Sequence, residues 1–129
     1  MPKININIPK PHKVFNKKIY NVLFDYSHFT EVHYGGASSG KSHGVVQKVV
    51  LKALKKWSKP RKVLFTRKVA ATIKDSIFED VKSCLSDFKL LEHCNINKTD
   101  YRIELPNGAV FLFKGMDKQT CPSKTSLIR

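Results

Sequence analysis

"YGGASSGKSHGVV", residues Tyr34 to Val46, is the stretch that decides the fold. It fits the pattern G-x-x-x-x-G-K-[ST], with Gly35, Gly40, Lys41 and Ser42 at the fixed positions. Glycines let the backbone curl until its N–H groups face one point, and a helix that starts there adds the positive end of its dipole. The stretch therefore predicts a loop that holds the phosphates of a nucleotide. The alternative is a glycine-rich turn that only caps a helix.

Each position of this loop has a predicted role. The Lys41 ammonium would reach the β- and γ-phosphates as a point charge, and the Ser42 hydroxyl would ligate Mg²⁺. The small residues between the fixed positions let the backbone approach the phosphates closely. The predicted cofactors are ATP and Mg²⁺, with Ser42 as the metal ligand. The predicted nucleotide-binding residues are Gly35, Gly36, Ala37, Ser38, Ser39, Gly40, Lys41 and Ser42.

Strands and helices are expected to alternate around the loop. The apolar periodicities and turn residues predict a helix at Lys17–Tyr26, a strand at Thr30–Tyr34, a helix from Ser42 to Pro60, a short buried strand at Lys62–Thr66, a helix at Thr72–Leu91 and a hairpin at Tyr101–Phe113. The hairpin turns at Asn107-Gly108, a favoured pair for a tight turn. This order predicts an α/β sheet, in an incomplete version of the three-layer α/β/α P-loop NTPase fold.

The two long helices have distinct faces. Three- and four-residue steps bring together one apolar face per helix: Val46, Val49, Val50, Ala53, Leu54 and Trp57 on the first, and Ile73, Ile77, Phe78, Val81 and Leu85 on the second. Lysines follow another face of the first helix, at Lys48, Lys52, Lys55 and Lys59. This lysine face is expected to be solvated, and contact with duplex phosphates is the other interpretation.

Composition indicates one basic domain. The chain has 129 residues, 41% of them hydrophobic, which is enough for one modest core. A net charge of +14 is typical of proteins that meet polyanions, although a lysine-rich solvated surface would have the same charge. The sequence shows no apolar run long enough for a membrane span and no signal-peptide core, so a cytoplasmic location is expected, with no membrane partner. Its three cysteines, an odd number without C-x-x-C spacing, favour neither disulfides nor a zinc site.

An acidic ligand for Mg²⁺ to accompany Ser42 does not emerge from the sequence. An ATPase of this kind needs an acid at the end of a later strand. The acids considered are Asp25, Glu79, Asp80 and Glu104, and each is interpreted as structural. Asp25 precedes the loop and has no second acid after it, Glu79 and Asp80 lie within a helical period, and Glu104 has a solvent-facing strand position. The five histidines show no ligand spacing. The sequence therefore predicts no metal-binding cluster and assigns no catalytic residue.

Three blocks in one order carry a family resemblance: "YGGASSGKSHGVVQKVVLKAL", "KVLFTRKVAATIKDSIFEDVKSCL" and "IELPNGAVFLFKGMD". Together they resemble the N-terminal ATPase domain of the phage terminase large subunit, in its PBSX-like branch. The resemblance covers about residues 9 to 117. Terminase large subunits use ATP to drive double-stranded DNA into a procapsid, and a separate C-terminal nuclease domain cuts the DNA. The resemblance implies as partners double-stranded DNA, a terminase small subunit, a portal protein and a C-terminal companion chain.

The resemblance also assigns residues and shows departures. Gly35 to Ser42 would be the Walker A motif, and Arg67 stands where the family often has an arginine. Many terminases carry another arginine inside the Walker A, a place that Ala37 holds here. The Walker B acids, the catalytic glutamate and the nuclease domain have no counterpart in the chain, so a truncated or split reading frame, such as a degraded prophage gene, is expected.

The expected organisation is therefore a partial N-terminal P-loop ATPase domain over 1–129. It comprises a lead-in at 1–29, part of the ATPase core at 30–117 and a divergent tail at 118–129. Such a chain is not expected to hydrolyse ATP alone. The alternatives are a basic nucleic-acid-binding module and a fragment of another P-loop NTPase, such as a small kinase or a helicase.

Overall fold

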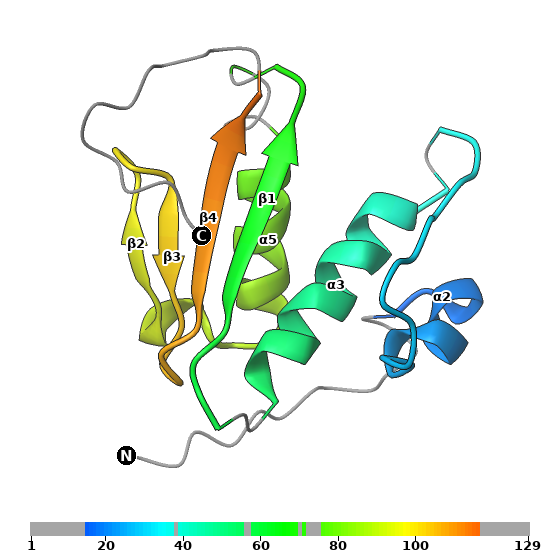
Figure 1. The fold of residues 1–129 in the computed structure, drawn as a ribbon, viewed down its shortest axis with the longest axis horizontal. Helices are drawn as coiled ribbons and strands as arrows, with labels where there is room; N and C mark the ends of the chain where they lie inside the picture. Colours follow the sequence, from blue (N-terminus) through cyan, green and yellow to red (C-terminus); the bar gives the residue numbers. More distant parts are fainter. Residues whose placement is uncertain (1–14, 38, 56–57, 70, 72–75, 117–129) are drawn as a thin grey trace.

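The described part of the chain is a mixed α/β structure. The computed structural model describes residues 15–37, 39–55, 58–69, 71 and 76–116 (Figure 1). Predictions for Ser38, Trp57, Ile73 and the tail at 118–129 fall outside these residues. The elements are α2 (Lys17–Leu23), α3 (Lys41–Leu54), β1 (Lys62–Arg67), α5 (Ile77–Asp87), η1 (Leu91–His93), β2 (Asn95–Asn97), β3 (Arg102–Glu104) and β4 (Val110–Gly115).

The sheet has four strands in the order β1-β4-β3-β2. β1 and β4 are parallel, with Lys62 opposite Val110, and β3 and β4 form the predicted antiparallel hairpin. β1 was predicted to be buried, and this is wrong: its burial alternates, and the Leu64 side chain is 51% exposed. The reason is that the described core covers only one face of the strand, where Val63 and Phe65 pack, while Leu64 lies on the other face. β2 was not predicted, because a single apolar residue, Ile96, gives no alternation.

The core joins the sheet, helix α5 behind it and helix α3, which lies beside β1 and contacts α5 (Figure 1). The predicted apolar faces are confirmed at their centres: Val46, Val50, Ala53, Phe78, Val81 and Leu85 are buried. Aromatic rings fill the sheet side. The rings of Phe65 and Phe113 stack at 5.0 Å, and Phe111 meets Phe65 edge-on at 5.6 Å. The same core holds Cys84 as a free thiol, and burial raises the pKa of Cys84 to about 12.

The prediction of a strand at Thr30–Tyr34 is wrong. This segment forms no ladder with the described sheet, and the side chains of Val32 and Tyr34 are 80% and 92% exposed. Alternation stabilises a strand only where a neighbouring strand and a covered face exist, and the segment has neither among the described residues. An ion pair holds it instead: the Glu31 carboxylate accepts from the Lys48 ammonium at 2.7 Å. The hydrogen bond from Lys48 lowers the pKa of Glu31.

Helix α2 confirms the predicted N-terminal helix, although it ends at Leu23, before the expected Tyr26. The Asn16 side chain caps it by accepting from the Lys18 N–H at 3.0 Å. Helix α2 packs on α3 at Gly44, where the absence of a side chain lets the two helices approach each other closely. A Cβ at Gly44 would lie 2.3 Å from Ile19 Cδ1 and 2.8 Å from its Cγ2. Gly44 is therefore a packing glycine rather than part of the loop.

Gly44→Ala is expected to lower the free energy of unfolding by up to about 2 kcal/mol. Overpacking costs ~1–3 kcal/mol, and the better helix propensity of alanine offsets ~1 kcal/mol of this. Urea denaturation followed by circular dichroism measures the change. In an Ile19→Ala background the same substitution should be neutral or stabilising, because the clashing atoms are gone. An equal loss in both backgrounds would show that the contact with α2 is not the cause.

No helix within the described ranges is long and apolar enough to span a bilayer.

Candidate phosphate-binding site

The loop before α3 ends in a backbone conformation that favours glycine. Gly40 is the N-cap of α3 with φ 78°, in the left-handed region, and its carbonyl accepts from the Gly44 N–H at 3.0 Å. Gly35 is restricted by space, since a Cβ there would lie 3.2 Å from Ser39 Oγ. Gly36 meets no such limit, because a Cβ at that position would have nothing within 4 Å. In this conformation, glycine is therefore favoured at Gly35 and Gly40, and not at Gly36.

Lys41 folds back onto its own loop. Its Nζ donates to the carbonyl oxygens of Gly35 at 2.8 Å and Gly36 at 3.0 Å. The Ser39 N–H donates to the same Gly36 carbonyl at 3.4 Å, which closes a turn. The lysine is hydrogen-bonded but has no carboxylate partner in these contacts, so an anion that entered the loop would replace two neutral acceptors with charged ones.

The start of α3 has features that attract an anion. Its first turn contains no acidic residue, and no side chain among the described residues caps Gly40. The first N–H groups of a helix have no partner within the helix, and together with the dipole they attract negative charge. Ser42 stands in this turn with an exposed side chain. The loop, the helix start and the Lys41 ammonium thus form one positively polarised corner.

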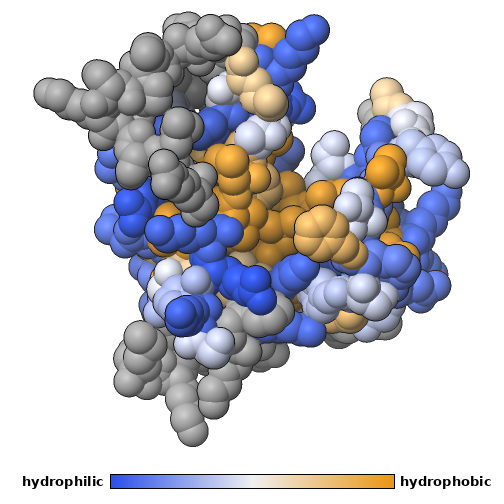
Figure 2. Space-filling model, viewed as in Figure 1, coloured by the Kyte–Doolittle hydropathy of each residue, from blue (hydrophilic) through white to orange (hydrophobic). Residues whose placement is uncertain are grey.

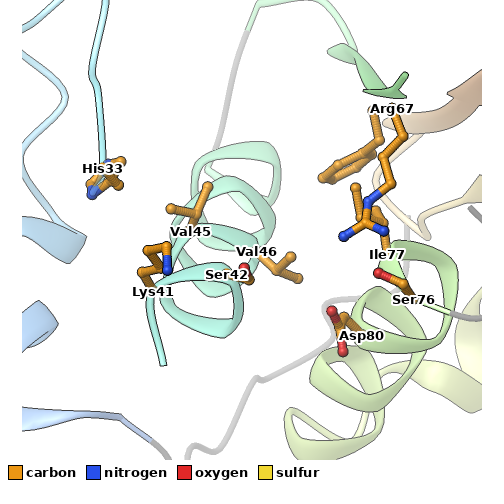
Figure 3. Close-up of a pocket in the computed structure, with 10 residues that line it drawn as sticks. His33, Lys41, Ser42, Val45, Val46, Arg67, Ser76, Ile77 and Asp80 are labelled. Carbon is orange, nitrogen blue, oxygen red and sulfur yellow. The ribbon is translucent and has the colours of Figure 1, made fainter. Parts of the chain in front are cut away.

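A cavity of about 290 Å³ opens beside this corner (Figure 3). Lys41 and Ser42 line it from the start of α3, and Arg67 lines it from the end of β1. Ser76 and Asp80 contribute from the start of α5, and His33 from the segment before the loop. Ligands of α/β proteins commonly bind at the carboxyl ends of the strands, where Arg67 stands. The structure therefore brings the predicted Lys41 and Ser42 to one cavity with Arg67, whose role the sequence left open. The other described residues of the predicted loop lie outside the lining: Gly35, Gly36, Ala37, Ser39 and Gly40.

Asp80 is the acid that the sequence did not assign to the site. It was interpreted as a helix residue, and it does lie in the first turn of α5, yet it also lines the cavity. An acid in the first turn of a helix is favoured by the dipole alone, so its position did not distinguish the two roles. Its neighbour Glu79 turns away and pairs with Lys82 at 2.8 Å. Asp25 and Glu104 lie outside the lining, paired with Ser27 and Arg102.

The lysine face of α3 is only partly solvated, which corrects the expectation. Lys48 is 8% exposed and bound to Glu31. Lys48, Lys52 and Lys55 all place their ammonium groups over the Tyr26 ring, at 5.7, 5.6 and 4.1 Å from its centroid. These cation–π contacts attach the segment after α2 to α3. Burial raises the pKa of Tyr26, whose hydroxyl has no hydrogen-bond partner among the described residues.

Within the described ranges, no group of three or more histidine, cysteine or acidic side chains is arranged to hold a metal ion. A metal carried by a bound nucleotide would be held differently, through phosphate oxygens and one or two protein ligands. The described lining of the cavity offers two hydroxyls, Ser42 and Ser76, and one carboxylate, Asp80.

Comparison with known proteins supplies the family. The model of the family described as phage terminase large subunit matches residues 27–125, which is most of the chain. Searches of curated proteins and of solved structures gave no match. The matched range includes the loop, α3, the whole sheet and the cavity. The chain therefore belongs to the phage terminase large subunit family.

Proposed function

We propose that this chain is the ATP-binding part of a phage terminase large subunit, an N-terminal motor domain that packages double-stranded DNA into procapsids. The domain would have the P-loop NTPase fold, with its core over residues 30–117. The observation that carries the proposal is the corner where Lys41 and the uncapped start of α3 share a cavity with Arg67. Family membership supports the packaging role.

The residues around this corner suit the phosphate groups of a nucleotide. Lys41 would leave the carbonyls of Gly35 and Gly36 for phosphate oxygens, which are charged acceptors and bind an ammonium more strongly. The α3 N–H groups would donate to the same oxygens. Ser42 would hold Mg²⁺, which supplies further neutralisation of phosphate charge when it is bound with ATP. Arg67 would face the far end of the phosphate chain from the β1 side.

Hydrolysis and packaging require more than this chain is proposed to supply. We assign no catalytic residue here and propose that ATP turnover depends on a C-terminal companion chain. Double-stranded DNA, a terminase small subunit and a portal protein are the further proposed partners. The net charge of +14 supports an attraction to duplex phosphates. Lys48 is excluded from such contacts because Glu31 already neutralises it.

Nucleotide titration tests the proposal. Binding of fluorescently labelled ATP, ADP and AMP to the purified chain should weaken in that order, because the predicted contacts are to the β- and γ-phosphates. Removal of Mg²⁺ should weaken ATP binding in the unchanged protein. In Ser42→Ala that dependence on Mg²⁺ should be largely lost. Equal affinities for ATP and AMP would contradict a phosphate-binding loop.

A further inference from the structure

His33 stands at one end of the cavity beside the phosphate loop. The cavity opens between the end of β1 and the segment before α3, where the surface of the molecule is hollowed (Figure 2). Figure 3 shows His33 on one side of the start of α3 and Arg67 on the other. Since the proposed function gives Arg67 to the far end of the phosphate chain, His33 faces the end that joins the nucleoside.

The His33 imidazole is held by a carboxylate. Its Nε2 lies 3.2 Å from Glu31 Oε2, and both oxygens of this carboxylate accept from the Lys48 ammonium, at 2.8 and 2.7 Å. The hydrogen bond from Lys48, and after it the one from His33, lowers the pKa of Glu31, so the carboxylate is ionised at neutral pH. An ionised carboxylate only accepts hydrogen bonds, and Nε2 must therefore carry a proton.

The other ring nitrogen, Nδ1, decides how His33 meets an anion. It has no hydrogen-bond partner among the described residues, and the side chain is 30% exposed. With Nε2 protonated, the neutral ring presents the Nδ1 lone pair, which repels a phosphate oxygen. The imidazolium instead presents an Nδ1–H, which donates to that oxygen in a charge-assisted hydrogen bond. One proton thus converts His33 from a repulsive group into an attractive one.

The charges around His33 make its protonation sensitive to a ligand. Glu31 favours the imidazolium, but Lys48 shares this carboxylate. The other titratable or charged groups that line the cavities on either side of His33 are Lys41, Arg67 and Asp80 in the larger one, and Tyr26, His28 and Lys52 in the smaller one of about 200 Å³. Cations outnumber carboxylates in this set, so a phosphate chain would supply the negative charge that favours one further cation.

We propose that His33 is a pH-dependent ligand of the nucleotide, which donates from Nδ1 to the phosphate nearest the nucleoside when the imidazole is protonated. Glu31 is the positioning residue that keeps the proton on Nε2. Histidine side chains gain a proton as the pH falls from about 8 to about 5, so nucleotide affinity should rise over this range and be lost again as the pH rises. The inference deepens the proposed function and rests on nucleotide binding by the loop.

The test compares the unsubstituted chain with His33→Gln, in which glutamine keeps an N–H for Glu31 but does not titrate. Equilibrium titration with fluorescently labelled ADP and Mg²⁺ gives the affinity at about pH 6 and about pH 8. The terminal phosphate of the ligand also titrates, but equally for both proteins, so the comparison removes that effect. The gain in affinity toward low pH should be at least ~3-fold larger in the unsubstituted chain, because only there is a charge-assisted hydrogen bond added.

His28→Gln is the matched control. It removes a histidine of the same segment that lies outside the described lining of the larger cavity, 3.6 Å from Asp25. Its pH dependence should equal that of the unsubstituted chain. His33→Arg keeps a cation at every pH, so it should retain the affinity while its pH dependence falls to that of His33→Gln. Equal pH dependence in the unsubstituted chain and His33→Gln would overturn the proposal, as would an equal loss in His28→Gln.

Nucleotide length tests which phosphate His33 contacts. ATP and ADP should show the same His33-dependent gain, because the phosphate nearest the nucleoside is common to both. A gain confined to ATP would overturn the placement of His33 at the nucleoside end. Nucleotide binding without any His33-dependent change would overturn the inference and leave the proposed function standing, whereas no nucleotide binding at either pH would overturn both.

Discussion

Lys41→Ala is expected to weaken ATP binding by about 10- to 100-fold. A hydrogen bond between charged groups contributes ~1.5–3 kcal/mol net, and each 1.4 kcal/mol is a tenfold change in affinity. Part of the gain from Lys41 is offset in the unsubstituted protein, because Nζ must first leave the carbonyls of Gly35 and Gly36. Equilibrium titration with labelled ATP in Mg²⁺ measures the change. The fold should persist, since the lysine contacts only its own loop in the hydrogen bonds described.

The control for this prediction is Lys52→Ala, which removes the same charge from the same helix away from the cavity corner. Its effect on ATP affinity should be less than ~3-fold at 0.15 M salt, where the Debye length is about 8 Å. Lys41→Arg should retain part of the affinity, because the charge stays while the geometry of the donors changes. Equal losses in Lys41→Ala and Lys52→Ala would mean that net charge, rather than the loop, attracts the nucleotide.

Phe111→Ala is expected to reduce the free energy of unfolding by about 3–5 kcal/mol. Phe111 is fully buried at the centre of β4 and meets Phe65 of β1 edge-on. Its loss would leave a cavity under the only contact between β1 and the rest of the described sheet. Small domains are stable by roughly 5–15 kcal/mol, so the variant should be close to unfolding at 25 °C. Urea or thermal denaturation followed by circular dichroism gives the value.

Leu64→Ala provides the comparison for this effect. Leu64 lies in the same parallel pair, but half of its side chain is exposed on the outer face. Its substitution should change the free energy of unfolding by no more than ~0.5 kcal/mol, as is usual for surface positions. Similar losses at Phe111 and Leu64 would show that the two faces of β1 and β4 are not covered as unequally as described.

Elements with a complete local pattern were predictable. The apolar period of α5 indicated Phe78, Val81 and Leu85 as inward residues, and all three are buried. Asn107-Gly108 marked the hairpin turn, where Gly108 has φ 88° and the Asn107 side chain accepts from the Ala109 N–H. In each case the residues that decide the conformation are close neighbours in the sequence. Helix ends were less well predicted, since α3 ends at Leu54 and α5 starts at Ile77.

Features that depend on a distant partner were not predictable. The pattern of Thr30–Tyr34 suits a strand, but no local residue specifies which strand would lie beside it. The burial of Lys48 depends on Glu31, which lies 17 positions earlier in the sequence. Asp80 reaches the cavity because α5 starts near the end of β1, a matter of topology rather than of spacing. For the candidate site, the motif identified Lys41 and Ser42, and the structure adds Arg67 and Asp80 as neighbours; nucleotide binding by the loop stays a prediction.

The parallel pairing of β1 with β4 has a consequence for how the chain acquires its structure. Lys62 pairs with Val110, 48 positions later in the sequence, and closing a connection of this length is entropically costly and slow. The β3–β4 hairpin and the helices involve short-range contacts and should form first. During synthesis, β1 leaves the ribosome well before β4 and exposes both edges and Leu64 in the interval. Aggregation of newly made chains is therefore expected to start at β1, and a chaperone that shields it would raise the yield.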